Sequence, residues 1–167
     1  MRLPQPPPAK RVFDLLGALA LLALLGLPLI ALAAALHLTD PGGAFRRDPA
    51  LGLGGRPYRT WRFRSAPDGR LARRRLDRLP ELLNVVRGEM SLVGPCPLPP
   101  GSVPATADRF HVRPGITGLW QIGGRSQLPW EEMDLLDRHY VENHWLGMDL
   151  AVLARTPRAA FAPRRVA

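Results

Sequence analysis

Hydrophobic and polar positions divide this chain at residue 38. Residues 15–38 are 24 consecutive positions without a formal charge, nearly all of them Leu, Ala, Gly or Ile. As a straight helix this run is about 36 Å long, enough to cross a hydrocarbon core of about 30 Å. The pattern predicts a membrane helix over residues 10–38, a Pro-rich tail over residues 1–9 and a domain over residues 39–167.

The charges around the apolar run bear on how it meets the membrane. Lys10 and Arg11 precede the run, and six arginines follow it between residues 46 and 64. Basic flanks favour the cytoplasmic side, so two basic flanks favour a re-entrant hairpin, which Pro28 could kink near its centre. Two alternatives stay open: a spanning helix that tolerates its proline, and a signal peptide cleaved among the small residues 31–35.

Beyond residue 38 the apolar positions become short, mixed patterns. Aromatic residues alternate with arginines in one segment, as in a strand. Apolar residues recur at spacings of three and four in others, as in helices. In chain order the patterns predict a strand over residues 57–65, a helix over residues 71–87 that Pro80 breaks and Gly88 ends, a loop over residues 91–104, a helix opened by Pro129, and an amphipathic helix over residues 146–160.

Composition narrows the classes of function. The formal net charge is +9, with 23 basic and 14 acidic residues, which suits an anionic membrane surface or phosphate-bearing substrates. The single cysteine, Cys96, excludes an intrachain disulfide and a cysteine-based zinc site. No basic motif interleaved with aromatic residues is present, so no nucleic-acid partner is expected.

Motifs spread over most of the chain point to one family. In chain order they are Lys10-Arg11-Val12-Phe13-Asp14, Asp40-Pro41-Gly42, Arg62-Phe63-Arg64-Ser65, Leu76-Asp77, Leu79-Pro80, residues 84–95, residues 113–121, Gly124-Arg125-Ser126, Trp130-Glu131-Glu132 and residues 140–143. Together they resemble the bacterial sugar transferases, the monotopic phosphoglycosyl transferases. Each motif alone is weak, and their shared order makes the resemblance specific.

The resemblance implies an activity, a fold and a location. The activity is transfer of a sugar-1-phosphate from a nucleotide diphosphate sugar to polyprenyl (undecaprenyl) phosphate, the first membrane step of exopolysaccharide, capsule or other glycan assembly. The fold is α/β and mostly helical: a small cytoplasmic domain on an N-terminal re-entrant helix broken at a proline, with interfacial amphipathic helices. The implied location is the cytoplasmic face of the bacterial cytoplasmic membrane. Membrane lipid is a further implied partner, and a homodimer stays open.

Catalytic residues follow from the same resemblance. In the family an adjacent Asp–Glu pair acts with magnesium, and its carboxylate can form a covalent phospho-enzyme. Asp77 matches the Asp, and Glu81, four residues later, is the second catalytic candidate. Glu89 lies where the family commonly has Asp, so Asp77 and Glu89 are expected to bind Mg²⁺. Taken alone, Asp77 would read as a helix-surface acid paired with Arg73 or Arg74.

Phosphate-binding residues are expected where arginine or flexible backbone is available. Guanidinium groups bind phosphate through charge-assisted hydrogen bonds, and glycine-rich backbone can cradle it through amide hydrogens. The alternative is that these glycines only make turns. The candidates are Arg64, Arg113, Gly115, Thr117 and Arg125.

Three departures from the family pattern support a different interpretation. Arg78 stands where the family has the Glu of the catalytic pair, and Cys96 stands where the family has an Arg between two prolines. The stretch between Ser65 and Leu76 is also short. An alternative is therefore a catalytically impaired relative that still binds polyprenyl phosphate or a partner enzyme.

Overall fold

The computed structural model describes residues 8–40, 42–66, 69–102, 107–123 and 130–161. This part of the chain is mostly helical, with two small two-stranded sheets. Its helices are α1 (Pro8–Thr39), α2 (Arg70–Arg73), α3 (Leu82–Arg87), α4 (Leu119–Ile122), α5 (Trp130–Asn143) and α6 (Leu146–Phe161), with 3₁₀ turns η1 (Leu53–Gly55), η2 (Leu76–Glu81) and η3 (Ala107–His111). Its strands are β1 (Phe45–Leu51), β2 (Pro57–Phe63), β3 (Ser91–Val93) and β4 (Gly115–Thr117).

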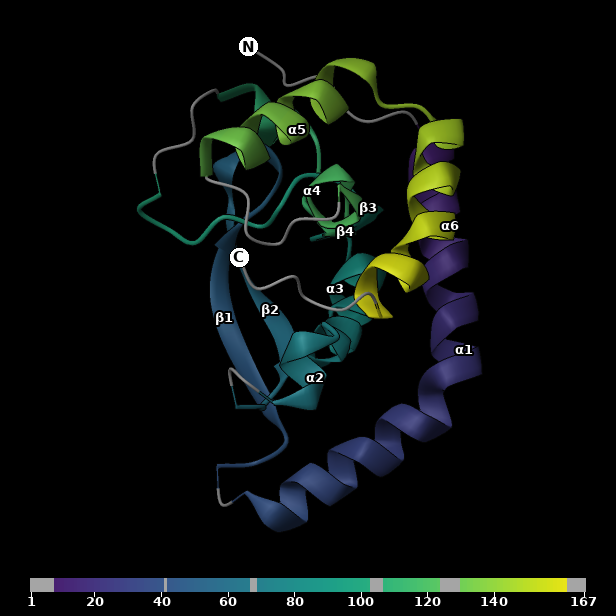
Figure 1. Ribbon diagram of the computed structural model, residues 1–167, viewed down its shortest axis with the longest axis vertical. Coiled ribbons are helices and arrows are strands. Elements are labelled where there is room, and N and C mark those ends of the chain that lie inside the picture. Colours follow the sequence, from purple (N-terminus) through teal and green to yellow (C-terminus); the bar gives the residue numbers. More distant parts are fainter. Residues whose placement is uncertain (1–7, 41, 67–68, 103–106, 124–129, 162–167) are drawn as a thin grey trace.

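Helix α1 has two different halves. Its first half packs on the domain, where Lys10, Asp14 and Ala18 are buried at a spacing of four residues. Its second half is exposed, as at Leu27, which is 82% exposed. Figure 1 shows α1 bending along its length before it leads back into β1, and Pro28 inside the helix supplies a cause for a bend. Both ends of α1 therefore join the same domain.

Strands β1 and β2 form an antiparallel hairpin along one edge of the domain (Figure 1). Its register pairs Phe45 with Phe63 and Arg46 with Arg62. Because side chains alternate between the faces of a strand, Phe45, Trp61 and Phe63 share one face, and Arg46 and Arg62 share the other with Tyr58. The predicted strand over residues 57–65 is confirmed as β2, whereas its partner β1 was not predicted.

The predicted helix over residues 71–87 is three shorter elements, α2, η2 and α3. Arg75, with φ of 55°, turns the chain into the left-handed region between α2 and η2. Pro80 lies inside η2 and has no amide hydrogen to continue an α-helix. Gly88, with φ of 83°, ends α3 as predicted. The actual break is therefore earlier and longer than Pro80 alone would make it.

The second sheet pairs β3 and β4 in parallel at the centre of the domain. The predicted loop over residues 91–104 is wrong in its first residues, which form β3. A Cβ atom on Gly115 would collide with the backbone of Gly94, so the two chain segments pack without room for a side chain. Helices α5 and α6 confirm the two predicted C-terminal helices and cover this sheet with Tyr140 and Val152.

Candidate active site

The predicted nucleophile Asp77 lies in η2, against the β1–β2 hairpin. Asp77 is 6% exposed, and Arg46 Nη2 lies 3.8 Å from its Oδ2 atom. Burial raises the pKa of the Asp77 carboxyl because a low-dielectric surrounding disfavours the charged form. The positive charges of Arg62, Arg78 and Arg46 oppose that rise. One buried carboxylate is thus surrounded by three guanidinium groups.

Glu81 lies beside Asp77 and is completely buried. Arg62 Nε donates a hydrogen bond to Glu81 Oε1 at 2.7 Å. Arg78 Nη2 lies 2.8 Å from Glu81 Oε2, and Arg78 Nε is 3.0 Å from the same oxygen. Both oxygens of the predicted second catalytic acid are therefore engaged by arginines. We call Arg46, Arg62, Asp77, Arg78 and Glu81 the arginine cluster.

Arg78, the residue that departs most from the family pattern, is buried inside this cluster. It is 4% exposed, and its guanidinium carbon lies 5.1 Å from the ring centroid of Trp120. Cys96, another departure, lies close enough for its thiol to interact electrostatically with Arg78. Two departures that are separate in the sequence therefore influence each other electrostatically in the folded chain.

The residues around Asp77 do not fit a magnesium ion. Magnesium is usually held by one or two carboxylates together with substrate phosphates. Glu89, the other predicted ligand, instead accepts a hydrogen bond of 2.6 Å from Asn84 Nδ2. Among the described residues no group of three or more Asp, Glu, His or Cys side chains is placed to hold a metal ion, and residues 70–78 contain five arginines against one aspartate. Magnesium stays a prediction of the resemblance.

The other candidate phosphate-binding residues lie apart from the arginine cluster or serve packing. Arg64 Nε is 3.6 Å from Asp40, and Arg113 Nε donates to the carbonyl of Gly88 at 2.8 Å. The hydroxyl of Thr117 lies 2.8 Å from that of Thr156, which joins β4 to α6.

Two candidates on or after β4 complete that set. Gly115 is packed against Gly94, although its carbonyl lies 3.5 Å from Arg78 Nη2. Arg125 lies outside the described residues. Among the phosphate candidates that the structure describes, the only link to the arginine cluster is therefore this backbone oxygen.

The loop that carries Cys96 is fixed to α5 by ionic contacts. Asp137 Oδ2 accepts hydrogen bonds from the amide of Cys96 at 3.0 Å and from Arg109 Nη2 at 2.8 Å. Arg109 Nη1 lies 3.0 Å from Asp134. Burial raises the pKa of the Cys96 thiol, which keeps it neutral and poorly reactive. Cys96 therefore contributes position and packing.

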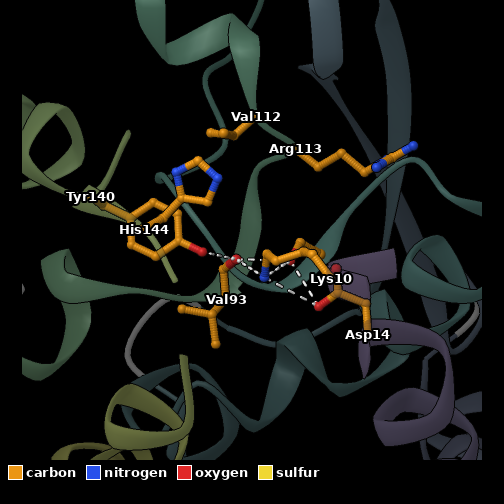
Figure 2. Close-up of a pocket in the computed structure, with 8 residues that line it drawn as sticks. Lys10, Asp14, Val93, Val112, Arg113, Tyr140 and His144 are labelled. Atoms are coloured by element: carbon orange, nitrogen blue, oxygen red, sulfur yellow. Dashed lines mark hydrogen bonds and ion pairs between the residues drawn. The ribbon is translucent and has the colours of Figure 1, made fainter. Parts of the chain in front are cut away.

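A second ionic cluster joins the start of α1 to the centre of the domain (Figure 2). Lys10 Nζ lies 2.8 Å from Asp149 Oδ2 and donates to the Ser91 hydroxyl at 2.8 Å. Asp14 Oδ1 accepts a hydrogen bond from the same hydroxyl at 2.9 Å, and the Tyr140 hydroxyl donates to Asp149 Oδ1 at 2.7 Å. All five side chains are buried. We call Lys10, Asp14, Ser91, Tyr140 and Asp149 the anchor cluster.

Sequence reasoning missed Arg46 as a site residue and treated Arg62 only as part of a motif. The register of the hairpin places the two opposite each other, and Asp48 follows on the same face. Asp48 Oδ2 lies 3.4 Å from Arg46 Nε and 3.8 Å from Arg62 Nη1. The alternation of Arg46 and Asp48 would have been informative once β1 was recognised as a strand.

The comparisons with known proteins agree with these motifs. The family model described as bacterial sugar transferase matches residues 6–70 and 67–163. EpsL of Bacillus subtilis, named an uncharacterized sugar transferase, is 36% identical over 172 residues, which cover 89% of this chain and 85% of EpsL. That alignment is longer than this 167-residue chain, so EpsL has residues that this chain lacks. The two segments of the family match meet at residues 67–70, inside the stretch predicted to be short.

Two further relatives carry the names of reactions. A UDP-glucose:undecaprenyl-phosphate glucose-1-phosphate transferase of Caulobacter vibrioides is 37% identical over 182 residues, covering 88% of this chain and 67% of the relative. A UDP-galactose-lipid carrier transferase of Erwinia amylovora is 33% identical over 187 residues, covering 88% of this chain but 39% of that protein. Family and names together define an enzyme that transfers sugar phosphates. The chain belongs to the bacterial sugar transferase family.

Proposed function

We propose that this chain transfers a sugar-1-phosphate from a nucleotide diphosphate sugar to undecaprenyl phosphate, with Asp77 as the nucleophile. The observation that carries the proposal is the buried carboxylate of Asp77 among three guanidinium groups, in a chain whose relatives are named for this reaction. A carboxylate with nearby positive charge can approach an anionic phosphate that would otherwise repel it.

The proposed chemistry has two steps. A carboxylate oxygen of Asp77 attacks the phosphorus that carries the sugar, the bond from that phosphorus to the bridging oxygen breaks, and the nucleoside monophosphate leaves with the bonding electrons. An oxygen of undecaprenyl phosphate then attacks the same phosphorus, and the bond to Asp77 breaks to restore the carboxylate. No step requires a proton from Glu81, whose oxygens are engaged by Arg62 and Arg78.

The membrane part of the proposal concerns α1, which is long and apolar enough to cross a membrane. Both ends of α1 join one domain, and its most exposed leucines, Leu24, Leu27 and Leu38, lie in the second half. Cleavage at residues 31–35 would remove the core residues Lys10, Asp14 and Ala18, which argues against a signal peptide. These features support a re-entrant helix with the domain on the cytoplasmic face of the membrane.

Cysteine labelling tests this topology. In a Cys96→Ala background, Ala9→Cys and Arg56→Cys place single thiols before and after α1. If α1 is re-entrant, an impermeant maleimide added to spheroplasts should label neither thiol until the cells are lysed. Labelling of one thiol in intact spheroplasts would instead show a spanning helix.

A transferase assay tests the chemistry. The full chain in detergent, with undecaprenyl phosphate and a panel of UDP-sugars, should release UMP with one of them. Asp77→Asn should lower the rate by on the order of 10³-fold or more, because the amide is a poor nucleophile of the same shape. Asp108→Asn, at a half-exposed acid in η3, is the matched control and should keep the rate. Equal UMP release by Asp77→Asn and the native chain would refute the role of Asp77.

A second candidate function is favoured by one observation. Arg78 is buried where the family has an acid, and it engages Glu81. A catalytically impaired relative that binds undecaprenyl phosphate or a partner enzyme would have the same contacts. It would bind undecaprenyl phosphate in vesicles and release no UMP from any UDP-sugar.

A further inference from the structure

The charge around Asp77 is unusual for a site expected to bind a metal ion. Arg46 lies 3.8 Å from Asp77, while Arg62 and Arg78 act on the same carboxylate through their charges. The adjoining segment, residues 70–78, adds further arginines and no other acid. A divalent cation entering here meets several positive charges, whereas a diphosphate is attracted by all of them.

The two outer arginines of the cluster can reach a ligand. The side chain of Arg46 is 40% exposed and that of Arg62 is 23% exposed, whereas Arg78 is buried behind them. The ion pairs of Arg46 use Nε and Nη2, and those of Arg62 use Nε and Nη1. Each guanidinium therefore has an Nη group outside these pairs. Guanidinium groups bind phosphate oxygens through paired N–H donors.

The contact distances in the arginine cluster fall into two groups. We call the contacts with the buried Glu81 inner contacts and those of the partly exposed Arg46 outer contacts. The inner contacts to Glu81 are 2.7–2.8 Å, which is the range of charge-assisted hydrogen bonds. The outer contacts of Arg46 with Asp48 and Asp77 are 3.4 and 3.8 Å. A phosphate can replace the long outer contacts while the short inner pairs keep Arg62 and Arg78 in place.

We propose that Arg46 and Arg62, with Arg78 behind them, bind the diphosphate of the nucleotide sugar directly, and that this site needs no divalent cation. The inference rests on the proposed function for its substrate class. It assigns to arginine side chains of this chain alone the charge neutralisation that was expected from arginine and magnesium together.

Binding of UDP tests the site independently of turnover. The probe is UDP titrated by calorimetry into the full chain in detergent, once with excess EDTA and once with MgCl₂. We expect the two Kd values to agree within about twofold, and Arg46→Gln to weaken UDP binding about tenfold in both. Arg62→Gln is the second variant and should act in the same direction. Arg138→Gln, at an exposed arginine on α5, is the matched control and should leave the Kd unchanged.

The outcomes separate this inference from the proposed function. UDP binding that appears only with MgCl₂, or that Arg46→Gln and Arg62→Gln leave unchanged, would overturn the arginine site. UMP release that EDTA abolishes would overturn it too, while leaving the proposed transferase function standing. Metal-independent UDP binding without UMP release from any UDP-sugar would support the arginine site and contradict the transferase function.

Discussion

The anchor cluster and the arginine cluster use similar side chains for different purposes. In the anchor cluster Lys10 is 6% exposed and lies 2.8 Å from both Asp149 and Ser91. In the arginine cluster the inner pair of Arg78 and Glu81 is equally buried, but Arg46 on the outside is 40% exposed and its contacts are long. The members of the anchor cluster are all buried, whereas the arginine cluster has partly exposed arginines on one side.

The difference shows how a structural ion pair can be told from a binding site. A buried charge is tolerated when its partners satisfy it, and removing one partner leaves the others unpaired. The anchor cluster pairs Lys10 with groups of α1, β3 and α6, although Asp14 Oδ2 has no hydrogen-bond partner among the described residues. Around Asp77 the charge of Arg46 is close but only loosely paired, which suits a ligand that brings its own negative charge.

The largest expected effect is loss of stability in the anchor cluster. Lys10→Met removes the cation from between Asp14 and Asp149, and breaking a buried pair in this way costs about 3–5 kcal/mol. We expect a lower midpoint in thermal unfolding followed by circular dichroism. Arg138→Gln is the control and should unfold at the native midpoint. If Lys10→Met unfolds at the native midpoint too, the anchor cluster is not what fixes α1 to the domain.

The next effect concerns Asp137, whose side chain is buried like those of the anchor cluster but changes its protonation state with pH. Burial raises the pKa of Asp137 from 3.8 to about 6, and Arg109 only partly opposes the rise. The folded state therefore prefers the protonated form, so this contribution is complete below pH 3.8 and is lost as the pH rises through about 6. Between pH 4 and pH 7 the free energy of unfolding of the native chain should fall, relative to Asp137→Asn, by about 2.4 kcal/mol.

Denaturant unfolding at several pH values measures this difference. The two proteins are compared by how their free energy of unfolding changes with pH, because Asp137→Asn also changes the hydrogen bond with Arg109 at every pH. Parallel pH profiles for the two proteins would mean that Arg109 keeps Asp137 ionised throughout.

The smallest expected effect concerns the pKa of Asp77 and its dependence on Arg46, at the exposed side of the arginine cluster. The pKa of Asp77 is raised by burial and lowered by Arg62, Arg78 and Arg46. The acid limb of kcat/KM should therefore lie above the ordinary aspartate pKa, and Arg46→Gln should move it to higher pH. The pH–rate profile of UMP release measures the limb, with Arg138→Gln as the control. If Arg46→Gln leaves the acid limb at the same pH, Arg46 does not act on the pKa of the nucleophile.

The sequence predicted the elements whose signals are local. An apolar run predicted α1, alternating aromatic residues predicted β2, and Gly88 marked the end of α3. Strand β1 was missed because Phe45–Leu51 contains a proline and three charges and becomes a strand only by pairing with β2. The register between two strands depends on both of them, so the sequence of one strand does not determine it.

The sequence predicted the two acidic residues at the centre of the candidate site, but not which residues lie around them. Motif matching found Asp77 and Glu81, which are neighbours in the chain as well as in space. Arg46 joins them only through the hairpin, and Cys96 comes near enough to interact electrostatically with Arg78 only in the folded chain. Arg64 contacts Asp40, and Arg113 contacts Gly88. Both contacts depend on tertiary structure, so the sequence motifs of the two arginines did not predict them.

The contact between Lys10 and Asp149 has a consequence for the order in which the chain folds. It joins two residues 139 positions apart, one in α1 and the other in α6. Contacts of such separation form slowly, because closing so long a loop costs conformational entropy. During synthesis the charged start of α1 therefore has no Asp149 partner until α6 has left the ribosome. A product that stops before α6 leaves Lys10 without Asp149, which makes it a ready target for quality control.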